Sequence, residues 1–186
     1  MALLHLDSSV PDPPVTRILG VDPGSRITGF GVIEVQGSRY TYVASGCISV
    51  QGEALSDRLR SLFINVDELV SEYTPAAMSV ERVFVQRNAD SALKLGQARG
   101  AAICAGALRP IVVHEYTPAQ IKKAIAGKGN ASKAQIQHMV KALLNLRGAL
   151  AEDAADALAC ALCHSHFSHT AQRMRAVAQL DGTQPQ

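Results

Sequence analysis

The sequence predicts an α/β protein in which a mixed β-sheet is flanked by helices. Three observations favour this fold class. The chain opens with three segments typical of strands, continues with helical and strand-like segments in alternation, and ends with three helical segments. A mixed sheet with helices on its faces is the natural packing for that order. With 47% hydrophobic and 18% charged residues, the 186-residue chain can bury a core of this kind.

The three opening segments are expected to be strands. Residues 17–22 form a short apolar run, Pro23 and Gly24 make a turn, and residues 27–35 resume the apolar pattern. Residues 40–50 are rich in Tyr, Val and Ile, which favour strands. The first two strands are therefore expected to join through a tight connection.

Helices and strands alternate in the middle of the chain. Apolar residues from Leu55 to Val70 recur at spacings of three and four, which is typical of an amphipathic helix. Residues 76–85 form a strand-like run. Asn88 is the expected N-cap of a second helix that ends near Leu108.

The last third of the chain is predicted to hold one short strand and three helices. Residues 111–113 are an apolar strand. Two capping boxes, in which a Thr or Ser precedes a Gln by three residues, start helices at residues 117–120 and 132–135. A final helix is expected from about residue 151 to residue 167.

Both ends of the chain are expected to lie outside the folded domain. Residues 1–16 contain three prolines and lack the basic and long apolar segments of a signal peptide, so they predict a disordered leader. Residues 170–186 lose the apolar periodicity and predict a flexible tail. The folded domain is expected over residues 17–169.

The composition predicts a cytoplasmic protein. Four cysteines are too few and too unevenly placed for a disulfide framework, which indicates a reducing compartment. No run of 18 apolar residues is present, so no membrane association is expected. The aromatic content of 4%, without any Trp, argues against a surface that stacks bases on many rings.

The formal net charge of +2 is the sum of two opposite parts. Residues 82–147 contain eleven Lys and Arg against two Asp and Glu, which gives this segment +9 and leaves −7 for the remainder. A basic segment spread over several elements suits a groove for a nucleic-acid backbone, since each phosphate contact releases counterions. A set of solvated helix faces would carry the same charge and is the alternative.

Four carboxylates interrupt apolar sequence. Asp22 ends the first strand and Glu81 lies inside a strand-like run. Asp153 and Asp156 are three residues apart, on one face of the last helix. Each has a structural alternative: Asp22 as a turn residue, Glu81 as the partner of Arg82, and the helical pair as first-turn acids favoured by the helix dipole.

Taken together, the four acids predict a metal site. Charges in such places are costly unless they are paired or bound to metal. The four can converge at one edge of the sheet as hard oxygen ligands for Mg²⁺ or Mn²⁺. Two such ions about 4 Å apart would activate a water and stabilise the leaving oxygen in phosphodiester hydrolysis.

Three segments resemble the RuvC-type Holliday-junction resolvases. They are ILGVDPGSRITGFGVI from residue 18, SVERVFVQRNADSALKLGQARG from residue 79 and EDAADALACALCH from residue 152. The similarity extends from about residue 17 to residue 166. The ungapped run NADSALKLGQARG is specific, because a general amphipathic helix does not explain it. The chain departs from the family chiefly in its leader.

The resemblance implies a ribonuclease-H-like fold, a homodimer and Mg²⁺-dependent symmetric nicking of four-way DNA junctions in recombination and repair. It also implies a partner, a branch-migration helicase complex. By position, the family's catalytic metal-binding acids, which would hold two Mg²⁺ ions with Mn²⁺ able to substitute, match Asp22, Glu81, Asp153 and Asp156.

The resemblance further implies DNA-binding residues. Lys122 and Lys133 match basic residues that the family places near the scissile DNA. Phe84 matches an aromatic residue at the junction. The exposed connection expected at residues 127–130 is interpreted as a loop that both joins two helices and touches DNA.

Other patterns are interpreted as structural. Cys160, Cys163 and His164 form the pattern of a haem-attachment site, but the leader does not support export, and small buried cysteines are the better account. His138 is expected at the surface. The small residues of the helix over 96–107 predict either close helix packing or, by the resemblance, a dimer contact.

Two other functions are alternatives to junction cleavage. Sugar kinases and actin-like ATPases also place an Asp-x-Gly phosphate turn after the first strand, as at residues 22–24, but they need two domains, for which 186 residues are too few. A non-catalytic DNA-binding scaffold would lack one of the four acids, and none is missing.

Overall fold

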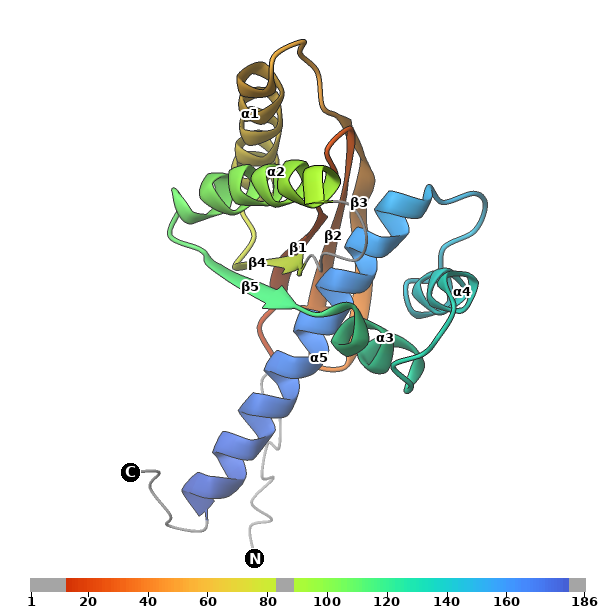
Figure 1. The fold of residues 1–186 in the computed structure, drawn as a ribbon. Coiled ribbons are helices and arrows are strands. Elements are labelled where there is room, and N and C mark those ends of the chain that lie inside the picture. Colours follow the sequence, from red (N-terminus) through yellow and green to blue (C-terminus); the bar gives the residue numbers. More distant parts are fainter. Residues whose placement is uncertain (1–12, 83–88, 181–186) are drawn as a thin grey trace, which may run out of the picture.

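The computed structural model describes residues 13–82 and 89–180, which form a five-stranded sheet with helices on both faces (Figure 1). The strands are β1 (Thr16–Asp22), β2 (Ile27–Gln36), β3 (Arg39–Ser49), β4 (Ala77–Glu81) and β5 (Val112–Tyr116). Their order across the sheet is β3-β2-β1-β4-β5. β1, β2 and β3 pair antiparallel, and β4 and β5 continue the sheet parallel to β1, which confirms the predicted mixed sheet.

The helices form one layer on each face. They are α1 (Leu55–Tyr73), α2 (Ala89–Ala107), α3 (Pro118–Ala126), α4 (Lys133–Leu143) and α5 (Glu152–Leu180). α1 and α2 cover one face, whereas α5, with α3 and α4 beside it, covers the other (Figure 1). Side chains alternate along β1, so Ile18 enters the α5 core and Leu19 the α1 core. Among the described residues, no helix is long and apolar enough to cross a membrane.

The helix starts predicted from the two capping boxes are confirmed. Thr117 Oγ1 accepts a hydrogen bond from the Gln120 N–H at 3.2 Å, and the Thr117 N–H donates to Gln120 Oε1 at 2.9 Å. Ser132 and Gln135 make the same reciprocal pair at the start of α4. The order of strands and helices along the chain is also as predicted.

β5 is longer than predicted, because its polar side chains find partners. The apolar pattern predicted a strand over residues 111–113, whereas β5 extends to Tyr116. His114 stacks on a histidine of α5 with ring centroids 4.2 Å apart, and Glu115 pairs with arginines of the neighbouring elements. Polar residues with partners of this kind continue a strand without an apolar pattern.

The chain is ordered further at both ends than predicted. β1 begins at Thr16, inside the predicted leader, and α5 continues to Leu180, through residues predicted as a flexible tail from residue 170. An apolar face is not required there, because α5 projects beyond the sheet (Figure 1). A helix that is already formed propagates through its backbone hydrogen bonds. Residues 1–12 and 181–186 lie outside the described range.

β4 is shorter than the predicted strand. It ends at Glu81, whereas the apolar pattern predicted a strand over residues 76–85. Residues 83–88, with the predicted N-cap Asn88, lie outside the described residues. α2 begins directly after them, at Ala89.

Candidate active site

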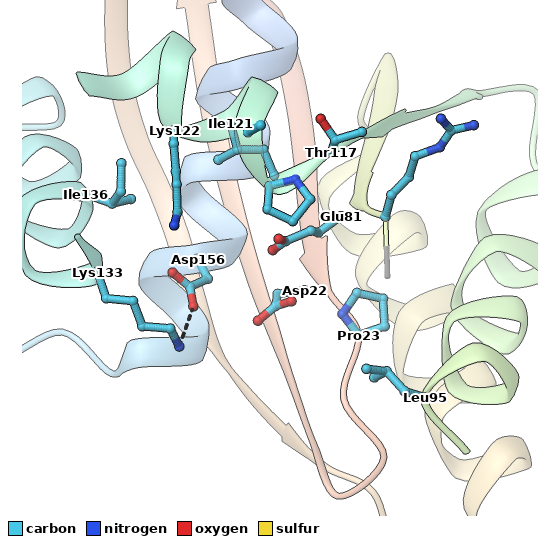
Figure 2. Close-up of a pocket in the computed structure, with 13 residues that line it drawn as sticks. Asp22, Pro23, Glu81, Leu95, Thr117, Ile121, Lys122, Lys133, Ile136 and Asp156 are labelled. Carbon is cyan, nitrogen blue, oxygen red and sulfur yellow. Dashed lines mark ion pairs between the residues drawn. The ribbon is translucent and has the colours of Figure 1, made fainter. Parts of the chain in front are cut away.

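A cleft of about 670 Å³ opens at the edge of the sheet where β1 and β4 end (Figure 2). Three of the four predicted acids and both predicted lysines line it, namely Asp22, Glu81, Asp156, Lys122 and Lys133. Figure 2 shows the three carboxylates pointing into the same space from three separate elements. The fourth acid, Asp153, lies in the first turn of α5, half-buried and outside the lining.

The parallel pairing of β1 and β4 places Asp22 beside Glu81. Val21 pairs in register with Val80, so the next residue of each strand reaches the same edge of the sheet. Both valines are fully buried, whereas the two acids that follow them are half-buried at the cleft. The strand ends therefore change from core to site within one residue.

Glycines in β1 and β2 bring the first turns of α5 to this edge. A Cβ at Gly29 would lie 1.9 Å from the carbonyl oxygen of Asp153, and one at Gly20 would lie 2.0 Å from that of Ala157. A larger residue at either place would push α5 away from the sheet. The helix backbone thus rests on the strands, with Asp156 at the cleft.

Burial and like charges act together on the carboxylates. Burial, followed by the charges of the other three acids, raises the pKa of Asp22 to about 7. Burial also raises the pKa values of Glu81 and Asp156. The Lys133 ammonium acts in the opposite direction on the pKa of all three. The cleft gathers more negative charge than its two lysines compensate.

The two lysines approach the acids from α3 and α4. Lys133 Nζ lies 3.6 Å from Asp156 Oδ2 and also pairs with Glu152 at the start of α5. The hydrogen bond to Glu152 raises the pKa of Lys133, which therefore stays charged. Lys122 on α3 lowers the pKa of Glu81. Because capping boxes start both helices, the approach of both lysines is set by local sequence.

The geometry disfavours two of the structural alternatives. A purely structural Glu81 requires an arginine partner such as Arg82, but Arg82 pairs with a carboxylate on β5. The turn after β1 is held by Thr28, whose Oγ1 accepts a hydrogen bond from the Gly24 N–H at 3.1 Å, so Asp22 is not needed as the turn residue. The dipole of α5 still accounts for the position of Asp153 in its first turn.

The donor set of the cleft fits a hard divalent cation. Carboxylate oxygens are the ligands that Mg²⁺ and Mn²⁺ prefer, and a cation would offset the burial and the repulsion that together raise the pKa of Asp22. Within residues 13–82 and 89–180, no three His, Cys, Asp or Glu side chains are grouped closely enough to hold a metal ion as they stand. Binding therefore requires the acids to move toward one another, and Asp156 to exchange its contact with Lys133.

Some residues of the cleft were not predicted from the sequence. Arg82, Leu95, Thr117 and Pro118 also line it. The capping box at Thr117 indicated the start of a helix, but no local signal indicated that this helix end faces the acids. The predicted DNA contact Phe84 lies outside the described residues.

The cysteine–histidine pattern of α5 belongs to the core, as predicted. Cys160 and Cys163 are fully buried. Burial raises the pKa of Cys163 to about 12 and that of Cys160 well above its ordinary value. His164 Nδ1 lies 2.8 Å from the Tyr116 hydroxyl, and the two groups share a hydrogen bond.

Two of the small residues predicted on one face of α2, Gly96 and Gly100, do not pack against the rest of the described chain, whereas Ala101 packs against the α1 core. Helix packing within the chain was one expectation for this face, but a Cβ at Gly96 or Gly100 would meet nothing within 4 Å in the part of the chain that the structure describes. The helix instead packs through Ala98, Ala102, Ala105 and Gly106. The predicted exposure of His138 is confirmed, and residues 127–130 form an exposed connection between α3 and α4.

Comparison with known proteins places this chain in a family. Residues 18–164 match the family described as "Crossover junction endodeoxyribonuclease RuvC". A protein of that name from Hahella chejuensis is 51% identical over 162 residues, which cover 87% of this chain and 94% of that protein. One from Alkalilimnicola ehrlichii is 55% identical over 159 residues, covering 86% and 96%.

Solved structures show the same relationship. The RuvC of Thermus thermophilus in complex with a Holliday junction substrate has a TM-score of 0.79 and 31% identity, covering 84% of this chain and 96% of that one. The yeast mitochondrial Holliday junction resolvase Ydc2, at 13% identity and a TM-score of 0.67, shares the fold. The predicted ribonuclease-H-like fold is thus confirmed. With a family match over residues 18–164 and relatives more than half identical, the chain belongs to the RuvC family of crossover junction endodeoxyribonucleases.

Proposed function

We propose that this protein resolves four-way (Holliday) DNA junctions by symmetric, metal-dependent nicking during recombination and repair. The observation that carries the proposal is the cleft in which carboxylates from β1, β4 and α5 meet two lysines, in a chain of the crossover junction endonuclease family. Carboxylates suit a divalent cation and lysines suit phosphate, so the cleft offers both halves of a phosphodiester reaction.

The four acids are assigned to the metal. Asp22, Glu81, Asp153 and Asp156 would hold two Mg²⁺ ions, with Mn²⁺ able to substitute. Such ions supply an activated water nucleophile and stabilise the leaving oxygen. Asp22 and Glu81 are fixed at strand ends and need only side-chain rotation. Asp156 has to give up its Lys133 contact of 3.6 Å.

The lysines are assigned to the DNA. Lys133, whose ammonium group lies 3.6 Å from Asp156 Oδ2 and also pairs with Glu152, would contact a phosphate beside the scissile bond. Lys122, on the neighbouring helix, lines the same cleft and would contact the same strand. The +9 segment over residues 82–147 extends this contact to the arms of the junction. For Phe84, the proposed contact with the junction rests on the sequence alone.

A homodimer, a branch-migration helicase complex as partner and a cytoplasmic location complete the proposal. The exposed face of α2 supports the dimer: Gly96 and Gly100 are open, and Leu93 is 62% exposed. A Leu93→Lys variant should then sediment as a monomer and cut only one strand of each junction. Val112, also 62% exposed but on β5, supplies the matched control Val112→Lys, which should remain dimeric. Equal sedimentation of both variants would contradict a dimer interface on this face of α2.

The deciding experiment compares a four-way junction with linear duplex of the same sequence, at matched salt and with Mg²⁺. The purified protein should nick the junction at paired, symmetric positions and leave the duplex intact. Asp22→Asn should abolish nicking and still bind the junction, since it removes a metal ligand and no cation. Equal cutting of junction and duplex, or full activity of Asp22→Asn, would contradict the proposal.

A further inference from the structure

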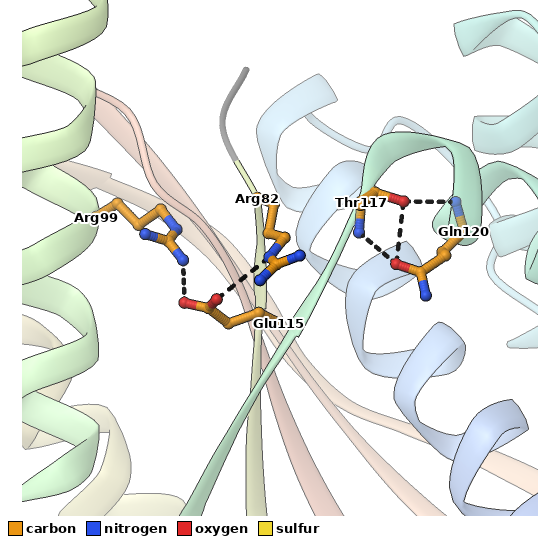
Figure 3. A network of polar contacts seen from close by, with 5 residues as sticks. All are labelled: Arg82, Arg99, Glu115, Thr117 and Gln120. Atoms are coloured by element: carbon orange, nitrogen blue, oxygen red, sulfur yellow. Dashed lines mark hydrogen bonds and ion pairs between the residues drawn. The ribbon is translucent and has the colours of Figure 1, made fainter. Parts of the chain in front are cut away.

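An ion-pair cluster lies beside the carboxylate cleft, where β4 and β5 end (Figure 3). Arg82 directly follows Glu81, the last residue of β4. Glu115 lies on β5, in register with Val80, and Arg99 projects from α2. The cluster thus joins three elements at the edge of the sheet that carries the acids.

Each oxygen of the central carboxylate holds one arginine. The Arg82 Nε–H group donates to Glu115 Oε2 at 3.4 Å, and the Arg99 guanidinium pairs with Oε1. Figure 3 shows the two arginines approaching the carboxylate from opposite sides. The backbone N–H of Arg82 also donates to the Tyr116 carbonyl at 2.8 Å. Both the backbone and the side chain of Arg82 are therefore fixed to β5.

The two arginines differ in their access to solvent. The side chain of Arg99 is 23% exposed, and its Nε is buried without a hydrogen-bond partner among the described residues. The side chain of Arg82 is 55% exposed and lines the cleft with the acids. Arg99 is thus placed to anchor the carboxylate, and Arg82 to meet a ligand.

The charge balance identifies the kind of ligand. Two guanidinium groups share one carboxylate, which leaves one positive charge in excess. The Nε–H group of Arg82 is engaged by Glu115, and within residues 13–82 and 89–180 no acceptor is found for its terminal N–H groups. The planar fork of these groups matches phosphate oxygens. A carboxylate repels DNA, and Glu115 is one of only two acids among residues 82–147, so its place beside the cleft needs a compensating role.

From these contacts we propose that Arg82 binds a backbone phosphate of the DNA substrate and that Glu115 is the positioning residue that holds it there. This inference rests on the proposed function, because the DNA must enter the cleft. The alternative is a purely structural cluster that joins α2 to the sheet. That alternative predicts a change in stability without a change in the number of phosphate contacts.

The test measures binding of a fluorescent four-way junction by the full-length chain, without divalent metal, over a series of NaCl concentrations. Arg82→Ala should weaken binding about fivefold to tenfold and lower the slope of log K against log [NaCl] by about one contact. Arg82→Lys keeps the charge without the fork, so it should restore the slope and only part of the affinity. Wild-type cleavage of the junction with Mg²⁺ is recorded in parallel.

Glu115→Gln separates positioning from charge. Charge alone predicts tighter binding, because a negative group is lost near DNA. Positioning predicts binding about threefold weaker, and no further loss when Glu115→Gln is added to Arg82→Ala, because the two residues then act as one unit. The matched control is the Arg17–Glu34 pair, which is partly exposed but lies outside both the cleft and the +9 segment. Arg17→Ala and Glu34→Gln should leave the slope unchanged.

The outcomes are distinct. An unchanged slope for Arg82→Ala, or tighter binding by Glu115→Gln, overturns the inference while wild-type cleavage of the junction keeps the proposed function. Failure of the wild-type chain to cut the junction removes the proposed function and this inference with it. A lower slope for Arg82→Ala that Arg82→Lys restores supports the phosphate contact.

Discussion

The helix α5 carries two patterns that resemble metal sites, and only one of them faces a cleft. Asp153 and Asp156 lie in its first turns, at the edge of the sheet. Cys160, Cys163 and His164 follow within two turns, and the two cysteines are fully buried. Both patterns place potential ligands at helical spacings. The two patterns differ in the residues that surround them.

At the first turns, the sheet supplies further carboxylates. Asp22 and Glu81 meet Asp156, and burial together with their mutual repulsion raises the pKa of Asp22 to about 7. Two turns later, apolar core surrounds the thiols, and burial raises the pKa of Cys163 to about 12. A thiol that stays protonated is a poor metal ligand, whereas crowded carboxylates gain from a cation. Spacing along a helix therefore identifies a ligand pair only when the facing element supplies the rest.

The largest expected effect is the loss of junction cleavage when a carboxylate of the first pattern is removed, compared with the removal of a thiol of the second. Asp156→Asn should reduce junction cleavage at least about 100-fold, because it removes one of the carboxylates proposed to bind the metal. Cys163→Ala should leave the cleavage rate within about threefold of wild type, since its sulfur contacts only the core. Single-turnover cleavage at saturating protein measures both. Comparable losses in the two variants, with both folded by circular dichroism, would break the distinction between the two patterns.

The second prediction concerns stability with and without metal. At pH 8 the raised pKa of Asp22 means that its ionised form is unfavourable in the folded chain. Asp22→Asn should therefore raise the Tm without metal by roughly 2–8 °C, for a gain of about 1–2 kcal/mol. Mg²⁺ at about 100 times its Kd should stabilise the wild type by about 2.7 kcal/mol and the variant far less.

Scanning calorimetry with EDTA or Mg²⁺ measures both effects. Cys163→Ala serves as the control from the other pattern, because its response to Mg²⁺ should equal that of the wild type. If Asp22→Asn proved less stable than the wild type in EDTA, then Asp22 would stabilise the metal-free fold. The idea that its charge is unfavourable without a cation would be wrong.

The same contrast explains how much of the molecule could be predicted from the sequence. Periodicity and capping boxes indicated the order of the elements, because Thr117 with Gln120 and Ser132 with Gln135 act within four residues. The strand β5 was predicted too short, because Glu115 is stabilised by arginines distant in sequence. The extension of α5 to Leu180 left no apolar signal, because that part of the helix does not pack on the sheet.

The candidate site was predictable to a different degree. Asp22, Glu81 and Asp156 stood out because each breaks an apolar pattern, and the structure brings them together. The roles of all four acids stay predictions. One of them, Asp153, also lies outside the lining of the cleft. Arg82 was predicted as part of the basic segment over residues 82–147 and as a possible structural partner of Glu81. Its actual partner comes from β5, and that pairing depends on sheet register, which the sequence alone does not contain.

The smallest expected effect is a difference in pH response between the two patterns of α5. Burial, and then the charge of His114, lowers the pKa of His164 to about 4, so the folded chain resists a proton that the unfolded chain binds near pH 6.5. The contribution of His164 to stability is fully present above about pH 6.5 and is lost as the pH falls toward 4. The acids respond in the opposite direction, since their raised pKa values favour the folded chain as they take up protons.

A His164→Asn variant isolates the histidine, because the amide can keep the hydrogen bond to Tyr116 but does not titrate. The difference in unfolding free energy between the wild type and this variant should change by about 1–2 kcal/mol between pH 7 and pH 4. The wild type should become less stable relative to the variant at the lower pH. Urea denaturation at each pH measures this difference. If it were the same at pH 7 and at pH 4, then His164 would take up its proton in the folded chain as readily as in the unfolded one. The second pattern of α5 would then be open to solvent and would lose the burial that separates it from the first.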